Sequence, residues 1–479
     1  MVLDDLNISG ILEIDSELNK IQDVDILLER ILLEARKMLN AEAGTIYKKD
    51  GDHLHFRYAQ NALQEKDLPP GHKLIYSGFQ VPINEKSIAG YVAKTGEILN
   101  LTDVYNLPPG VPYSFGKGYD EKSGYKSTSM LTVPLKTAVG GTLGVIQLLN
   151  AKDKDGRTVP FSKAGEPIIT HFAANATNQL QMALFIRGTI LMANRVAQLK
   201  DSHETGAHVN RVASFAAEIY ERWAFKKGIP DAESERTKDT LKLAAMLHDV
   251  GKVGINDLIL KKPARFTEEE RSIMEGHTFC GARLFSDDTD YDRMAADIAL
   301  THHENWDGTG YPGKVDYRNS YFEVRQIEVE GVARTGEVWY APALETGPDG
   351  RARRLKGEEI PLAGRIVAVA DVFDALCSRR VYKESWDPAT VYEELRKMSG
   401  TKFDPEIVEA FFDIQQTIEH IQGQFPDMAH EEGVEAKAAQ AKAAGAAPVG
   451  GPPAGGAAAP AAEATGPAKK GGKAGARGR

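Results

Sequence analysis

The spacing of apolar and polar positions divides the first third of the chain into helices and strands. Residues 15–40 carry apolar side chains at helical spacing and predict one amphipathic helix. Shorter alternating segments predict a hairpin over residues 45–58 and strands over residues 97–101, 129–135 and 143–150, with a short helix near residues 87–93. After a lead of residues 1–14, this order predicts an α+β domain over residues 15–185.

A long helical pattern covers residues 164–200 almost without a break. Its apolar stripe includes Phe172, Leu180, Ile190 and Leu199. An isolated helix cannot bury such a stripe, so the pattern predicts the seam of a parallel homodimer, or a helix packed on its own domain. A dimer seam here would also connect the first domain mechanically to the middle of the chain.

The last segment, residues 432–479, changes in composition from about Ala436 to Ala, Gly, Pro and Lys. It has no aromatic side chain and no sustained apolar period, so it cannot offset the entropy lost on ordering and is expected to be a disordered tail. Its basic end could contact a partner, and a solvated tail is the simpler interpretation.

The overall composition narrows the function class. The chain has 479 residues, 42% of them hydrophobic and 26% charged, which predicts two or three globular domains. A formal net charge of −10 argues against a general nucleic-acid binder. The N-terminus lacks the pattern of a signal peptide and no segment has the length of a membrane helix. Only two cysteines occur, Cys280 and Cys377, so we expect core thiols and a reducing cytoplasm.

Histidines and carboxylates concentrate in the middle of the chain. Six of the twelve histidines lie between His203 and His303 inclusive. Each candidate lies beside a predicted helix. Glu204 and His208 are spaced i, i+4; His248 and Asp249 end an apolar segment that Gly251 can terminate; His277 follows a helix start at residues 267–270; His302 and His303 follow residues 295–300; Asp371 follows the apolar residues 366–370.

Adjacent His-Asp and His-His pairs at helix ends are costly unless something uses them. Imidazole and carboxylate ligands without thiolates suit iron, manganese or zinc. Divalent ions bound there would activate water and polarise a phosphate group, so the pattern indicates a metal-dependent phosphodiesterase.

Residues 200–425 resemble the HD-GYP domain, the phosphodiesterase branch of the HD superfamily. The resemblance lies in the strings HETGAHVNRV, HDVGKVGI, HHENWDGTGYP, RIVAVADVFDAL and RRVYK. It implies an all-α domain that hydrolyses cyclic di-GMP to pGpG and, in some members, to GMP. The metal ligands that it implies are Glu204, His208, His248, Asp249, His277, His302, His303 and Asp371. Glu204 favours three ions over two, with iron or manganese preferred to zinc.

The resemblance also implies residues that act on the substrate. Besides His248 and Asp249, Lys252 would add positive charge at the phosphate, and Arg380 and Lys383 match positions that contact phosphate in the family. The alternative for these three cations is a solvated surface. Tyr311 could stack on a guanine base or only pack the loop, and Asp307 and Gly308 could serve turn chemistry alone.

The chain departs from the family in two places. An insert of about residues 313–358 follows Pro312, and residues 321–327 and 337–340 within it predict an added β-hairpin. Because the insert follows the loop that ends at Pro312, where the substrate would bind, it could be a lid or specificity element, or equally a tolerated surface insertion. Val381 replaces the proline that the family often has, which leaves the placement of Arg380 and Lys383 open.

Residues 15–185 resemble a GAF domain through the strings SIAGYVAKTGEILNLTDVY, STSMLTVPL and LGVIQLLNAKD. That resemblance implies a regulatory domain that binds a small ligand, such as a cyclic nucleotide, or a dimerisation module without ligand. For the whole chain we expect a cyclic di-GMP phosphodiesterase. Hydrolysis of another cyclic dinucleotide, such as cyclic GMP-AMP, and a catalytically silent ligand-sensing scaffold are the alternatives.

Overall fold

The computed structural model describes residues 8–62, 80–200, 205–329, 332–377 and 387–426. The chain begins with two helices, α1 (Ile8–Leu18) and α2 (Val24–Met38), so the single helix predicted over residues 15–40 is wrong. The Asp23 carboxylate accepts the backbone N–H groups of Asp25 and Ile26 and thereby starts α2 as a new helix.

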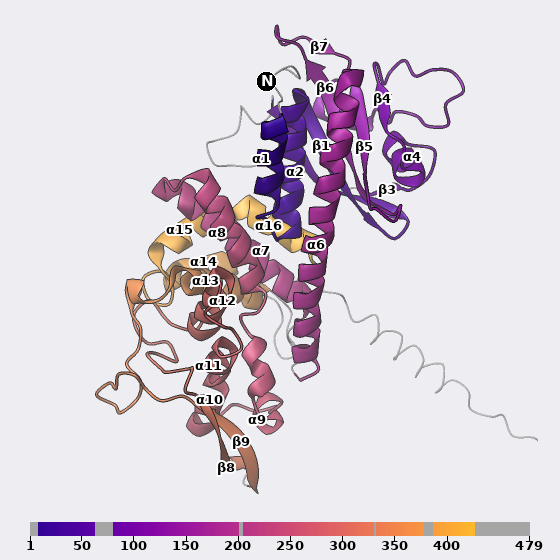
Figure 1. Cartoon of the computed structure of the whole chain (residues 1–479). Helices are drawn as coiled ribbons and strands as arrows, with labels where there is room; N and C mark the ends of the chain where they lie inside the picture. Colours follow the sequence, from indigo (N-terminus) through magenta and orange to yellow (C-terminus); the bar gives the residue numbers. More distant parts are fainter. Residues whose placement is uncertain (1–7, 63–79, 201–204, 330–331, 378–386, 427–479) are drawn as a thin grey trace, which may run out of the picture. The chain divides into compact units, whose positions relative to one another are not determined.

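An antiparallel sheet follows. Its strands are β1 (Ala41–Asp50), β2 (His53–Asn61), β3 (Gln80–Pro82), β4 (Leu99–Leu101), β5 (Met130–Lys136), β6 (Thr142–Lys152) and β7 (Thr158–Val159). They are ordered β3-β2-β1-β6-β5-β4, and β7 pairs with β6. Successive side chains of β1 point to opposite faces: Ile46 packs with α2 and α6 (Glu166–Gln198), and Tyr47 packs beside α4 (Ile88–Thr95). The helices therefore cover both faces (Figure 1).

The second part is helical. Its helices are α7 (Gly206–Lys227), α8 (Asp231–Ala245), α9 (Asp257–Leu260), α10 (Glu268–Glu275), α11 (His277–Ala282), α12 (Asp290–Thr301), α13 (Leu362–Cys377), α14 (Pro388–Met398), α15 (Pro405–Asp413) and α16 (Gln415–Gln424), with short 3-10 turns η3 (Val250–Gly254) and η4 (Gly357–Glu359). Its core includes the buried rings of Phe215, Phe373 and Phe411. The predicted fold class, an α+β domain followed by an all-α domain, is confirmed; the predicted tail lies outside the described residues.

The insert holds the predicted hairpin, β8 (Tyr321–Val329) paired with β9 (Val332–Tyr340). The hairpin extends from the helical part beside α9 and α10 (Figure 1). It is anchored by Trp339, because a Cβ built on Gly254 would lie 2.7 Å from the indole Nε1 of this side chain. The insert therefore packs against η3, the turn that follows His248 and Asp249.

Among the residues that the structure describes, no helix has both the length and the apolar composition needed to cross a bilayer. The two cysteines are free thiols; Cys280 is buried and Cys377 is half-buried.

Candidate metal centre

The structure gathers seven of the eight predicted ligands into two clusters. We call Asp249, His277, His302 and His303 the first cluster, and His208, His248 and Asp371 the second cluster. Within each cluster, one ligand atom per residue lies within 4.8 Å of the others. These side chains come from α7, α11, α13 and the turns that follow α8 and α12, so the tertiary fold brings together residues separated by as many as 163 positions.

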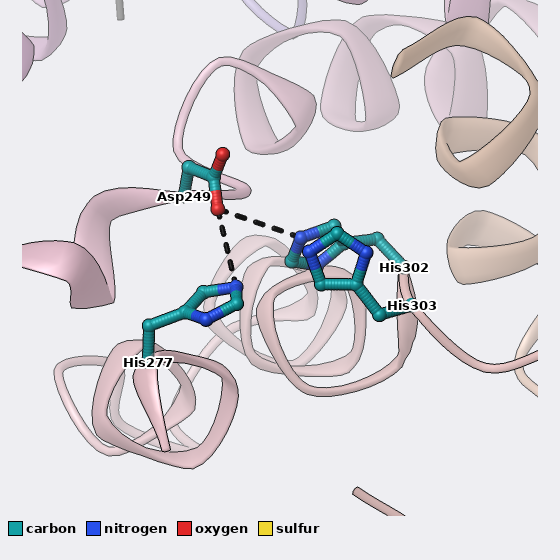
Figure 2. A group of neighbouring side chains, drawn as sticks. All are labelled: Asp249, His277, His302 and His303. Atoms are coloured by element: carbon teal, nitrogen blue, oxygen red, sulfur yellow. Dashed lines mark ion pairs between the residues drawn. The ribbon is translucent and has the colours of Figure 1, made fainter. Parts of the chain in front are cut away.

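The first cluster is centred on the Asp249 carboxylate (Figure 2). Its Oδ1 lies 3.2 Å from His277 Nε2 and 3.6 Å from His302 Nε2. The ring centroids of His302 and His303 are 4.0 Å apart. Lys252 Nζ lies 2.8 Å from Asp249 Oδ2, so the lysine that we expected at the phosphate pairs with a cluster carboxylate.

The second cluster adjoins the first through His248. His248 Nε2 lies 3.5 Å from Asp249 Oδ2 and 3.9 Å from Asp371 Oδ1, and His208 Nε2 lies 3.7 Å from Asp371 Oδ1. His208 is fixed from behind by Asp374, whose Oδ2 lies 2.8 Å from His208 Nδ1. The guanidinium of Arg211 pairs with both oxygens of the same carboxylate.

Three of the imidazoles are oriented by backbone carbonyls. His248 Nδ1 lies 2.9 Å from Ala245 O, His277 Nδ1 lies 2.7 Å from Met274 O, and His302 Nδ1 lies 2.9 Å from Ile298 O. A carbonyl only accepts hydrogen bonds, so in the neutral ring Nδ1 carries the proton and Nε2 keeps its lone pair. Each ring therefore presents an acceptor atom to the clusters.

These acceptor atoms have no hydrogen-bond partner. Four of the buried side-chain atoms that lack a partner in the described part of the chain belong to the clusters: His248 Nε2, Asp249 Oδ1, His277 Nε2 and His302 Nε2. A buried polar atom left unpaired costs about 1–3 kcal/mol, and here four such atoms converge. Acceptor atoms that face one another are satisfied by a shared cation, so the donor set fits divalent metal ions of the iron, manganese or zinc type.

Electrostatics favour the metal-binding forms of three of these side chains. Burial raises the pKa of Asp249, but Lys252 and the neighbouring imidazoles outweigh burial and hold that pKa well below its usual value. Burial lowers the pKa of His302, and burial together with adjacent imidazoles holds the pKa of His303 well below its usual value. Near neutral pH the carboxylate is charged and these two rings are neutral.

The loop that follows His303 is compact. The Tyr311 ring packs on the His303 ring with centroids 4.8 Å apart, so one face of the tyrosine covers a cluster ligand. A Cβ on Gly310 would lie 2.2 Å from the backbone nitrogen of Asn305, and only glycine fits there. Asp307 accepts the backbone N–H of Thr309, which is turn chemistry.

Three predicted site residues, Glu204, Arg380 and Lys383, lie outside the described residues. Helix α7 begins at Gly206, with Thr205 as its N-cap, and the i, i+4 relation between Glu204 and His208 stays a prediction. The role predicted for Gly251 is also wrong, because α8 already ends at Ala245. A Cβ on Gly251 would lie 1.9 Å from His277 O, so this glycine permits α11 to approach.

Asp374 was not predicted as a site residue. It lies three positions after Asp371 on α13, and this spacing places both carboxylates on one helix face. That spacing was a usable signal. Its connection to His208 depends on the packing of α13 against α7, which the sequence pattern does not specify.

Two kinds of family model match the chain, in the order of the fold. A GAF domain model matches residues 23–180, and an HD domain model matches residues 205–376. A second HD domain model matches residues 346–407.

Relatives match about half of this chain. The 3'3'-cGAMP-specific phosphodiesterase 2 of Vibrio cholerae is 35% identical over 227 residues, which are 47% of this chain and 34% of that protein. A cyclic di-GMP phosphodiesterase of Thermotoga maritima is 33% identical over 252 residues, which are 52% of this chain and 55% of that protein. The chain thus spans about a third to a half of the length of these two relatives.

Proposed function

Since this chain carries a GAF domain followed by an HD domain, we propose that it is a metal-dependent phosphodiesterase that hydrolyses cyclic di-GMP to pGpG. The observation that carries the proposal is the convergence of four buried, unpaired acceptor atoms from His248, Asp249, His277 and His302. The cyclic di-GMP phosphodiesterase of Thermotoga maritima, 33% identical, supports the substrate class.

The residues of the chain have separable tasks in this reaction. Bound divalent ions would supply an activated water molecule and neutralise charge on the phosphate. His248, His277 and His302 would hold the ions through their Nε2 lone pairs, because backbone carbonyls fix their Nδ1 protons. Asp249 lies between the clusters, within 3.6 Å of three imidazole nitrogens, and would hold the ions together with these rings. The cationic Lys252 keeps this carboxylate ionised.

A turnover assay tests the proposal. The full chain is loaded with Fe(II) under anaerobic conditions, or with Mn(II), and incubated with cyclic di-GMP. We expect pGpG to form, and we expect His248→Ala and Asp249→Ala to abolish turnover. Asp413→Ala is the matched control. The Asp413 carboxylate pairs with Arg222 and Lys226, so this substitution removes the same kind of charge away from the clusters. Normal turnover by His248→Ala would contradict the assignment.

A second substrate is favoured by one observation. The 35% identical relative from Vibrio cholerae is named as specific for 3'3'-cGAMP. Assaying cyclic di-GMP, 3'3'-cGAMP and cyclic di-AMP at equal concentration with the same preparation separates the two substrates. A chain that retains no metal by elemental analysis and turns over none of the three would be the silent scaffold instead.

We also propose that the chain forms a parallel homodimer through α6. The stripe expected from the sequence is wrong in part, because Phe172, Leu180 and Ile190 are buried in the chain's own core. Five other large apolar side chains, on this helix and at its C-cap, are exposed by 56–83%: Met182, Phe185, Met192, Val196 and Leu199, the last of which was in the expected stripe. With Thr189 they alternate spacings of three and four residues, which is the a/d pattern of a coiled coil. Phe185→Glu with Leu199→Glu should give a monomer by light scattering. Ala174→Glu, exposed on α6 outside this stripe, should leave the dimer intact.

The same helix supports regulation by the GAF domain. Asn194 on α6 donates a hydrogen bond to Met246 O at 3.0 Å, and Lys200, just after α6, donates one to Val253 O at 2.8 Å. The end of α6 and the residues after it therefore hold the backbone on both sides of His248 and Asp249. We propose that ligand binding in the GAF domain shifts α6 and changes the clusters. Asn194→Ala should change the basal turnover rate while binding of cyclic di-GMP persists; unchanged turnover would contradict this route.

The ligand site that we propose in the GAF domain is a cavity of about 450 Å³ between the sheet and α4. Its lining includes Thr45, Tyr47, Phe56 and Gln147, and the described part of it contains no lysine or arginine to meet a phosphate. That lining suits an uncharged ring better than a cyclic nucleotide. Binding of a cyclic nucleotide in this domain therefore stays a prediction. Titrations of the full chain with cyclic AMP and cyclic GMP, with Gln147→Leu as the variant, decide between the two.

A further inference from the structure

A second cavity, of about 460 Å³, adjoins the first cluster. His303 and Tyr311 form part of its wall. The remainder is strongly cationic and comes from three separate parts of the chain. Its charged side chains are Arg271 from α10, Arg351 and Arg354 from the insert, Lys402 from the loop between α14 and α15, and one carboxylate, Glu275.

The insert segment that carries two of these arginines is fixed to the loop after His303. Lys314 N donates to Arg353 O at 2.7 Å, and Arg354 Nη1 donates to Pro312 O at 3.2 Å. A Cβ on Gly313 would lie 2.5 Å from Arg353 O, so the two chain segments are in direct contact. The segment around Arg354 is therefore held against the loop of residues 304–312, which we call the substrate loop.

The loop that carries Lys402 is held in the same way. The backbone carbonyl of Lys402 accepts the N–H of Trp306 at 3.1 Å, and the carbonyl of Thr401 accepts the N–H of Asp307 at 2.8 Å. The substrate loop is thus hydrogen-bonded to residues 401–402 as well as to the end of the insert, and both neighbours contribute a cation to one cavity.

The cations have no acidic partner within 4.0 Å among the described residues. Arg353, next in the chain to Arg354, differs in this respect, because it pairs with both Glu345 and Glu359. Burial raises the pKa of Glu275, and the nearby arginines only reduce that rise. Four cations around one carboxylate leave the cavity with a net positive charge that favours an anionic ligand.

We propose that this cavity binds the second, non-scissile phosphate of a cyclic dinucleotide, and that Arg271 and Arg351 are its specificity-determining contacts. This inference rests on the proposed function. A cyclic dinucleotide carries two phosphodiesters in one ring, so when one lies at the metal ligands the other lies one nucleotide away. The cavity shares His303 with the first cluster and lies at that side. Guanidinium groups suit such a site because they bind phosphate with two parallel hydrogen bonds.

Arg271 and Arg351 are the cleanest residues to change. Both are exposed, and neither side chain has an ion-pair partner within the described residues, so truncation leaves no buried group unpaired. Arg354 is less suitable because it also tethers the loop at Pro312. The matched control is Arg325→Ala, which removes an exposed arginine from the β-hairpin of the same insert, where it pairs with Glu323.

The experiment measures binding and turnover separately. Metal-loaded wild type, Arg351→Ala, Arg271→Ala/Arg351→Ala and Arg325→Ala are titrated calorimetrically with a non-hydrolysable phosphorothioate analogue of cyclic di-GMP. KM and kcat are measured with cyclic di-GMP, and turnover is measured with bis(p-nitrophenyl) phosphate, a diester that has one phosphate. We expect the double variant to raise Kd and KM by roughly tenfold or more, with kcat within about twofold and the small diester unaffected.

The outcomes separate this inference from the proposed function. If wild type binds the analogue and the double variant binds it equally well, the cavity does not hold the second phosphate. If the double variant loses turnover of both substrates equally, the arginines support the fold and the inference is wrong. If wild type cleaves bis(p-nitrophenyl) phosphate yet neither binds nor cleaves any cyclic dinucleotide, the proposed function itself fails.

Discussion

Replacing Asp374 by leucine should separate two roles of one buried carboxylate. Asp374 is fully buried, its Oδ2 lies 2.8 Å from His208 Nδ1, and Arg211 Nη2 donates to the same oxygen at 2.9 Å. Arg211 and His208 together hold the pKa of this carboxyl below its usual value although burial raises it. One role is to neutralise Arg211; the other is to orient His208 so that Nε2 faces the second cluster.

The expected magnitudes follow from these contacts. Removing one partner of a buried ion pair costs about 3–5 kcal/mol, because the other charge stays buried. Removing the hydrogen-bond partner of a metal-ligating histidine lowers metal affinity by about 10–100-fold. Asp374→Leu should show both losses. Arg211→Met/Asp374→Leu removes both charges, so it should recover most of the stability while the affinity loss persists.

The assay uses urea unfolding of chelated protein for stability and titration with Mn(II), followed by electron paramagnetic resonance of the free ion, for affinity. All four tryptophans lie between residues 223 and 386, so their fluorescence reports on the helical part. A double variant that binds its second equivalent of Mn(II) like wild type would refute the orienting role. A single variant as stable as wild type would refute the ion-pair argument.

Three further predictions concern single residues. Gly251→Ala puts a methyl carbon 1.9 Å from a carbonyl oxygen at the start of α11. It should lower the free energy of unfolding by about 3 kcal/mol and abolish metal binding at the first cluster. Gly188→Ala, with open space on α6, should instead raise the free energy of unfolding, measured in urea, by about 0.5–1 kcal/mol. Burial raises the pKa values of Cys280 and Cys377 to about 11, so at pH 8 about one thiol in a thousand is ionised; alkylation should be slow when folded, rise about tenfold per pH unit, and become fast in urea. Tyr311→Phe keeps the ring on its histidine neighbour and should retain turnover within about twofold, whereas Tyr311→Ala should lose at least about tenfold in kcat/KM.

Hydrophobic periodicity was sufficient for most elements. The strand patterns near residues 45–58, 129–135 and 143–150 correspond to β1, β2, β5 and β6, because each has one face in an apolar core. The pattern failed at residues 19–23, where helical spacing continues across a break. Asp23 uses its carboxylate to start a new helix, and this local hydrogen bond overrides the period.

The candidate site was predictable in its ligands and not in its surroundings. His248, His277 and His302 stand at helix ends with recognisable signals. Arg271 and Arg351 carry no such signal, because 80 residues separate them and only the tertiary fold brings both to one cavity. An arginine in a polar segment looks the same in sequence whether it is solvated or faces a substrate. Only its burial and its partners in the folded chain distinguish the two cases.

One structural device recurs at the centre and explains why helix ends carry its histidines. A carbonyl has two lone pairs, so one near a helix end can accept an imidazole N–H as well as a backbone N–H. His248, His277 and His302 follow α8, α10 and α12, and each places Nδ1 against a carbonyl three or four residues earlier. One interaction selects the tautomer and aims Nε2 at the clusters. His208, near the start of α7, has no preceding helical carbonyl, and there the buried carboxylate of Asp374 takes the same role. A variant that removes that carboxylate should therefore disturb the second cluster more than the first.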